Sequence, residues 1–280
     1  ITMSDIKKEP QQKQRKRFAR KKMTVGRETV TERLQALSFA RLLPNLATVM
    51  AMCVGMSAIR FALLGHFQMA AAAILIAGVL DAMDGRLARL LGASSEFGAE
   101  LDSLSDFVSF GVAPPIVLYI LSLQSWQGLG WVPCLFFAVC MGLRLARFNI
   151  SSRDPEQPLW SGRFFTGVPA PAGAMIALFP LMLNLAFDMS VLVHPSVCAF
   201  FLLLGGGLMV SRLPTFSFKT VSIPRFLLFP LLILFGLLVV ALFSAPWETL
   251  SFVTFCYLCI IPFGQRSFKK MLNIDKSEDV

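Results

Sequence analysis

The feature that most constrains this chain is a series of eight apolar segments, each about as long as a helix that crosses a lipid bilayer. Such a helix takes about 20 residues, because each residue adds about 1.5 Å across a hydrocarbon core about 30 Å thick. We expect spans at 45–64, 68–91, 98–123, 128–149, 168–187, 194–211, 225–244 and 247–264. The sequence therefore predicts an all-α fold, a polytopic integral membrane helical bundle with about eight transmembrane helices.

The charge of the chain fits a membrane surface better than a nucleic acid. The residues are 55% apolar and 15% charged, and the formal net charge is +9. Twelve of the 26 Lys and Arg residues lie in the first 41 positions, and most of the others flank apolar segments. Anionic lipid headgroups are therefore the expected counterpart, and no nucleic-acid partner is expected.

The two ends of the chain are polar. Residues 1–26 are rich in Lys, Arg and Gln, without an apolar face, and predict a disordered basic tail. Residues 27–43 repeat apolar positions every three to four residues, which predicts an amphipathic juxtamembrane helix on the membrane surface. Residues 267–280 predict a second polar tail.

The connections between the expected spans predict their orientation. Four short turns, at 65–67, 124–128, 188–194 and 245–247, contain no Lys or Arg, whereas the other connections are basic. The positive-inside rule then places both termini in the cytoplasm, as in a multi-pass protein of a bacterial-type inner membrane. Arg60 is the exception, and the sequence leaves open whether it reaches outward or pairs within the bundle.

Four aspartates interrupt the apolar sequence near the expected cytoplasmic end of the second and third spans. Each carboxylate costs about 2.5–3.5 kcal/mol at the centre of a membrane-spanning helix, so a cluster requires positive compensation. Asp81 and Asp84 are three residues apart, and Asp102 and Asp106 are four apart, so each pair shares a helix face. Dense oxygen ligands favour Mg²⁺ or Mn²⁺, with Ca²⁺ as a further candidate. The simpler alternative is a salt bridge between a single aspartate and a nearby arginine.

The spacing of these residues is specific. Residues 81–106 read D-x2-D-G-x2-A-R-x8-G-x3-D-x3-D. In this pattern the chain resembles the CDP-alcohol phosphatidyltransferase family. The resemblance implies that a CDP-linked lipid binds with its diphosphate on one or two divalent metals. A small alcohol then attacks the lipid-side phosphorus, and CMP leaves.

The resemblance also implies a role for each motif residue. Asp81, Asp84 and Asp102 match metal ligands. Asp106 matches the general base that deprotonates the attacking hydroxyl, and is also expected to contact metal. The expected CDP-binding residues are Asn45, Asp84, Gly85, Ala88, Arg89 and Gly98.

The acceptor alcohol depends on sequence outside the motif. Segments after the motif resemble the bacterial and archaeal members that use L-serine, and Arg144, Arg147 and Arg212 are candidates for the serine carboxylate or the lipid phosphate. Glycerol 3-phosphate, inositol and choline remain alternatives. A glycerol 3-phosphate or inositol phosphate acceptor would require a denser basic pocket, and choline an aromatic cage.

The resemblance divides the chain and implies its partners. Residues 44–220 correspond to the catalytic membrane domain, and 221–266 to two additional C-terminal transmembrane helices. CDP-diacylglycerol and L-serine are the implied substrates, in phospholipid biosynthesis, and a homodimer is the implied assembly. Outside the enzyme class, a cation transporter is the distant alternative. It is disfavoured because the aspartates lie near one membrane face and no internal repeat is evident.

Overall fold

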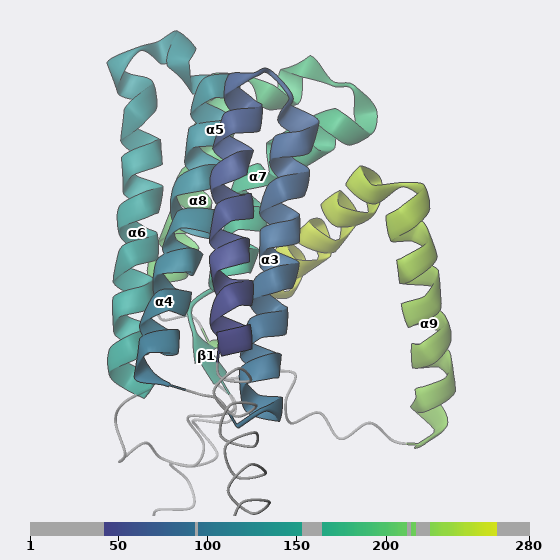
Figure 1. The fold of residues 1–280 in the computed structure, drawn as a ribbon. Helices are drawn as coiled ribbons and strands as arrows, with labels where there is room; N and C mark the ends of the chain where they lie inside the picture. Colours follow the sequence, from purple (N-terminus) through teal and green to yellow (C-terminus); the bar gives the residue numbers. More distant parts are fainter. Residues whose placement is uncertain (1–41, 93–94, 153–163, 212–213, 217–224, 262–280) are drawn as a thin grey trace, which may run out of the picture.

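The computed structural model describes residues 42–92, 95–152, 164–211, 214–216 and 225–261 (Figure 1). The expected tails 1–26 and 267–280 lie outside these residues, as does almost all of the expected surface helix 27–43. The described part confirms a polytopic helical bundle, and six of its helices are long and apolar enough to cross a membrane. The helices are Leu42–Leu63, α3 (Phe67–Leu90), α4 (Glu96–Asp106), α5 (Ala113–Leu121), α6 (Gly128–Ser152), α7 (Ala170–Phe187), α8 (Pro195–Val210), α9 (Arg225–Ser244) and Pro246–Ile261.

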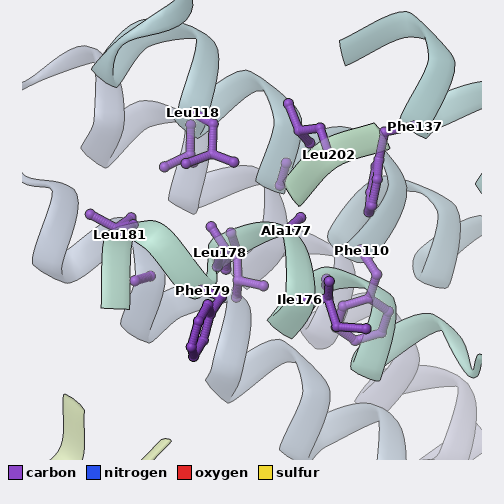
Figure 2. Packing of buried hydrophobic residues seen from close by; sticks show 14 of the residues in the cluster. Phe110, Leu118, Phe137, Ile176, Ala177, Leu178, Phe179, Leu181 and Leu202 are labelled. Carbon is purple, nitrogen blue, oxygen red and sulfur yellow. The ribbon is translucent and has the colours of Figure 1, made fainter. Parts of the chain in front are cut away.

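Helix α7 occupies the centre of the bundle. All seven residues from Ile176 to Met182 are buried, so the helix is covered on every side. Figure 2 shows side chains of α7 directed to different sides, with Leu202 and Phe137 on one side and Phe179 on another. Because lipid tails are as apolar as these side chains, the helices associate through close packing rather than through exclusion of water.

Small residues allow the surrounding helices to approach closely. Buried alanines line the helix Leu42–Leu63 and α3, and glycines perform the same function elsewhere. A Cβ atom at Gly173 of α7 would lie 2.5 Å from the Sδ atom of Met209 on α8. A Cβ atom at Gly55 would lie 2.3 Å from the Oγ atom of Ser109. The second contact joins the helix Leu42–Leu63 to the span that carries Asp102 and Asp106.

The third span contains a turn of π-helix. It runs from Glu96 to Leu121 as α4, the π-helix η1 (Phe107–Val112) and α5. Pro114 and Pro115 follow η1 and begin α5. Each proline lacks the amide hydrogen that would bond to the carbonyl four residues earlier, and its ring displaces that carbonyl, so the preceding turn widens. The widened turn begins directly after Asp106.

A two-stranded ribbon was not expected from the sequence. Strands β1 (Phe164–Thr166) and β2 (Pro214–Phe216) pair antiparallel, with Phe164 opposite Phe216. The ribbon joins the segment before α7 to the segment after α8. Figure 1 places β1 at the end of the bundle where α3 ends and α4 begins. The two-stranded ribbon therefore lies at the end of the bundle that carries the aspartates.

The last two described helices form a hairpin beside the bundle. In Figure 1, α9 stands apart from the other helices, and none of its apolar window is buried within the chain. The helix Pro246–Ile261 returns to the bundle, where Trp247 and Ile261 are each 9% exposed. Among the described helices, α9 is long and apolar enough to cross a membrane, whereas Pro246–Ile261 and α8 are shorter apolar helices.

Candidate active site

Three of the four aspartates form one compact group. Asp81 and Asp84 lie on α3, and Asp102 lies on α4. One carboxylate oxygen from each residue lies within 4.8 Å of the others. Asp84 is 4% exposed, whereas Asp81 and Asp102 are half-buried. The two helix faces predicted from the residue spacing therefore meet.

Asp106 lies beside this group rather than within it. It is the last residue of α4, and its carboxyl group interacts directly with that of Asp81. The guanidinium group of Arg144, on α6, interacts electrostatically with Asp106 and Asp81. The Oδ1 atom of Asp106 and the Nη1 atom of Arg144 are buried and have no hydrogen-bond partner among the described residues. Asp106 thus interacts both with Asp81 and with Arg144.

A cavity of about 310 Å³ opens beside the three-carboxylate group. The helix Leu42–Leu63, α3 and α4 form its walls. All six residues expected to bind CDP line it, namely Asn45, Asp84, Gly85, Ala88, Arg89 and Gly98. The remaining lining residues are Pro44, Thr48, Ser95, Ala99 and Asp102.

Two glycines of the motif have different surroundings in this cavity. A Cβ atom at Gly85 would meet no other atom within 4 Å, so this position faces open space. A Cβ atom at Gly98 would lie 3.0 Å from Oδ1 of Asn45 and 3.1 Å from Oγ of Ser95. Gly98 therefore allows two polar side chains to approach the start of α4. Gly85 leaves room for a ligand.

The three candidate arginines outside the motif differ in what the structure shows of their surroundings. Arg144 lies next to the aspartates, as described above. Arg147 donates a hydrogen bond from Nη2 to the carbonyl of Val210 at 2.9 Å, which satisfies a backbone group at the end of α8. Arg212 lies outside the described residues.

Comparison with known proteins identifies the family. A family model described as CDP-alcohol phosphatidyltransferase matches residues 41–211. The chain belongs to the CDP-alcohol phosphatidyltransferase family. A second family model, described as CDP-alcohol phosphatidyltransferase 2, matches residues 227–262, which include most of α9 and the whole helix Pro246–Ile261. Membership in a family of transferases removes the cation transporter that the aspartates alone had left open.

Individual relatives extend the similarity over most of the chain. The CDP-diacylglycerol–serine O-phosphatidyltransferase of Mycobacterium tuberculosis is 40% identical over 227 residues, which cover 81% of this chain and 79% of the relative. The enzyme of the same description from Helicobacter pylori is 35% identical over 78% of this chain and 88% of its own length. The enzyme of that description from Saccharomyces cerevisiae is 38% identical over 127 residues, or 44% of this chain.

The residues present in this family member fit a divalent metal. Three carboxylates supply hard oxygen ligands, which Mg²⁺, Mn²⁺ and Ca²⁺ prefer. The Oδ2 atom of Asp84 is buried and has no hydrogen-bond partner among the described residues. A buried carboxylate oxygen without a partner is costly unless a cation compensates it. The group therefore indicates a divalent metal site.

The structure adds residues that sequence reasoning did not select. Thr48 and Ser95 line the cavity, and Ser95 accepts a hydrogen bond from the amide of Gly98 at 3.0 Å. Ser95 directly precedes the first residue of α4, and a serine in that position is an N-cap signal. Tyr257 is the other addition. It lies on the helix Pro246–Ile261, and no spacing relates it to the motif.

Proposed function

We propose that this chain transfers the phosphatidyl group of CDP-diacylglycerol to L-serine, giving phosphatidylserine and CMP. The observation that carries the proposal is the three-carboxylate group beside a cavity lined by the family's motif residues. Serine as the acceptor is supported by relatives described as serine transferases that are 35% and 40% identical over 78% and 81% of the chain.

Asp81, Asp84 and Asp102 are the residues that would hold the divalent cation, with Mg²⁺ and Mn²⁺ as the first candidates. Bound there, the cation would neutralise the diphosphate and withdraw electron density from its oxygens. Whether Asp106 also contacts the cation stays a prediction, since its carboxylate is not among the three that converge. Every other step rests on the side chains of the chain itself.

The cavity is the proposed site for the cytidine diphosphate. Gly85 and Ala88 keep the α3 wall free of large side chains, and Asn45 and Gly98 line the cavity from the helix Leu42–Leu63 and α4. Arg89 supplies positive charge at the rim, where a phosphate oxygen would accept hydrogen bonds from its guanidinium group. The diacylglycerol part would extend into the surrounding lipid.

Asp106 is the proposed general base. It accepts the proton of the serine hydroxyl, and the resulting oxygen nucleophile attacks the phosphorus that carries diacylglycerol. A new P–O bond to serine forms as the P–O bond to the CMP phosphate breaks. The electron pair of the broken bond leaves with CMP. The positive charge of Arg144 interacts electrostatically with this carboxylate.

We place the site at the cytoplasmic face of the membrane, with both termini on the same side. The turns at the opposite end of the bundle, at 65–67, 124–128, 188–194 and 245–247, contain no Lys or Arg, which supports this orientation. The family resemblance further implies a homodimer, and light scattering of the detergent-solubilised protein tests it.

The proposal is tested by CMP release from purified protein supplied with CDP-diacylglycerol and Mg²⁺ or Mn²⁺. L-serine, glycerol 3-phosphate, inositol and choline are compared as acceptors, and a reaction with EDTA controls for the metal. Of the four acceptors, we expect only L-serine to give CMP release, and we expect no release in the presence of EDTA. Release with another alcohol but not with serine would refute the acceptor. A protein inactive with all four would refute the transferase itself.

A further inference from the structure

The C-terminal helix Pro246–Ile261 lies outside the core matched by the main family model, yet it packs against that core. Its inner face carries the nearly inaccessible side chains of Trp247, Ser251, Thr254 and Ile261. Tyr257 follows Thr254 by three residues and is half-buried, with its hydroxyl buried. This helix therefore places the hydroxyl group of Tyr257, from the C-terminal part of the chain, inside the bundle.

The hydroxyl of Tyr257 is one of five buried side-chain polar atoms that have no hydrogen-bond partner among the described residues. Oδ1 of Asp106 and Nη1 of Arg144 are two of the others. The guanidinium of Arg144 interacts electrostatically with both Tyr257 and Asp106. Arg144 on α6 thus interacts with a carboxylate of α4 and with a hydroxyl of the helix Pro246–Ile261, which is remote in sequence.

Unsatisfied buried polar atoms in a native structure call for an explanation, because each forfeits the hydrogen bonds that water had supplied. A bound ligand would supply these hydrogen bonds. A guanidinium and a phenol hydroxyl both donate hydrogen bonds, and together they match the two oxygens of a carboxylate. Asp106 beside them is placed to accept a proton from a hydroxyl on the same molecule. The combination fits a small hydroxylated amino acid.

We infer that Tyr257 and Arg144 together bind the α-carboxylate of the acceptor, so that the C-terminal hairpin determines specificity for serine. The inference rests on the proposed function, since it names how the acceptor is held in that same site. Alcohols such as choline and inositol have no carboxylate and would leave both donors buried and unpaired. A site built to pair with a polar group rejects a ligand that lacks that group.

The test is Tyr257→Phe, which removes one oxygen and keeps the ring that packs in the bundle. We expect the KM for L-serine to rise about tenfold or more, as for loss of a hydrogen bond to a charged group, with the KM for CDP-diacylglycerol unchanged. The matched control is Tyr119→Phe in the other tyrosine of the chain, which stacks edge-on against Trp131 at a centroid distance of 4.9 Å. That variant is expected to keep both KM values.

Three results would overturn the inference. An unchanged serine KM in Tyr257→Phe would show that the hydroxyl does not bind the acceptor. A rise in the KM for CDP-diacylglycerol instead would assign the hydroxyl to the lipid diphosphate. A fall in kcat and in melting temperature with both KM values kept would assign it to structure. By contrast, a wild-type protein that releases no CMP with serine would contradict the proposed function, and with it the carboxylate ligand.

Discussion

At the scale of single residues, four carboxylates at one end of a bundle would repel one another unless their surroundings differed. The structure gives them two environments. Asp81, Asp84 and Asp102 converge within 4.8 Å, which suits a divalent cation and little else. Asp106 lies outside that group and interacts both with Asp81 and with Arg144, whose positive charge opposes the repulsion from Asp81. Neighbouring carboxylates of the same chemical type can therefore serve different steps, as ligands and as a base.

The first prediction concerns the base. In Asp106→Asn the side chain keeps its shape but no longer accepts the proton of the attacking hydroxyl. We expect CMP release to fall by about 10²- to 10⁴-fold, the usual contribution of general base catalysis. Binding of CDP, measured by calorimetry in the presence of Mg²⁺, should persist. Near-normal turnover would exclude Asp106 as the base, whereas loss of CDP binding would place it among the ligands for the nucleotide or the metal.

The second prediction concerns the nucleotide cavity. In Gly85→Leu the new Cβ atom would meet no other atom within 4 Å, so the melting temperature should stay within a few degrees of wild type. The side chain would fill volume that we assign to CDP, and the KM for CDP-diacylglycerol should rise at least tenfold.

The control for this variant is Gly207→Leu. Gly207 lies on α8, is exposed, and likewise has no atom within 4 Å of a built Cβ. It should leave both the melting temperature and the KM unchanged. A Gly85→Leu protein with normal KM would mean that the nucleotide binds elsewhere.

At the scale of elements, the site depends on the contact between the helix Leu42–Leu63 and the third span. Ser105 donates a hydrogen bond to the carbonyl of Thr48 at 3.1 Å, and Ser109 donates one to the carbonyl of Ala51 at 3.4 Å. Gly55 lies against the backbone of Ser109. These contacts lie on the π-helix η1 and the last turn of α4, so they fix the height and rotation at which Asp102 and Asp106 face α3.

The third prediction follows from this contact. In Gly55→Ala the Cβ atom would lie 2.9 Å from the Cα atom of Ser109, so backbone must move. We expect a loss of about 1–3 kcal/mol in the free energy of unfolding, as for an overpacked interface, and reduced turnover. Thermal unfolding in detergent measures the loss. Gly236→Ala, in the exposed helix α9, is the control, and should match or exceed wild-type stability. Equal stability of the two variants would contradict the packing role of Gly55.

Sequence reasoning predicts the helices well because bilayer thickness fixes their length and apolar composition marks their extent. The expected spans 68–91 and 225–244 correspond to α3 and α9 within one residue at each end. It also predicts the convergence of Asp81, Asp84 and Asp102, since helical periodicity gives each pair a common face. It does not predict Tyr257 or η1. The neighbours of Tyr257 depend on how its helix is rotated against the other helices. The widened turn depends on how the backbone before Pro114 and Pro115 adjusts to the two prolines.

At the scale of the whole molecule, the three-carboxylate group and the cavity lie toward the end of the bundle where α3 ends and α4 begins. The turn that joins the helix Leu42–Leu63 to α3, and the segment Leu123–Trp126, lie at the other end, as Figure 1 shows. A soluble amino acid and CMP must therefore enter and leave on one side of the membrane. The direction of the bundle across the membrane decides which compartment supplies serine, and the basic connections favour the cytoplasm.

The orientation is testable with single cysteines in a protein whose six native cysteines have been replaced. Gly92→Cys places a thiol just beyond α3 at the aspartate end, and Gln124→Cys places one in the turn at the opposite end; both positions are exposed. A membrane-impermeant maleimide added to intact cells, or to spheroplasts if an outer membrane blocks it, should label Gln124→Cys at once and Gly92→Cys only after permeabilisation. Retained CMP release by the cysteine-free protein confirms that the bundle is intact. Labelling in the reverse order would show that the bundle has the opposite orientation in the membrane. Serine would then have to arrive from outside the cell.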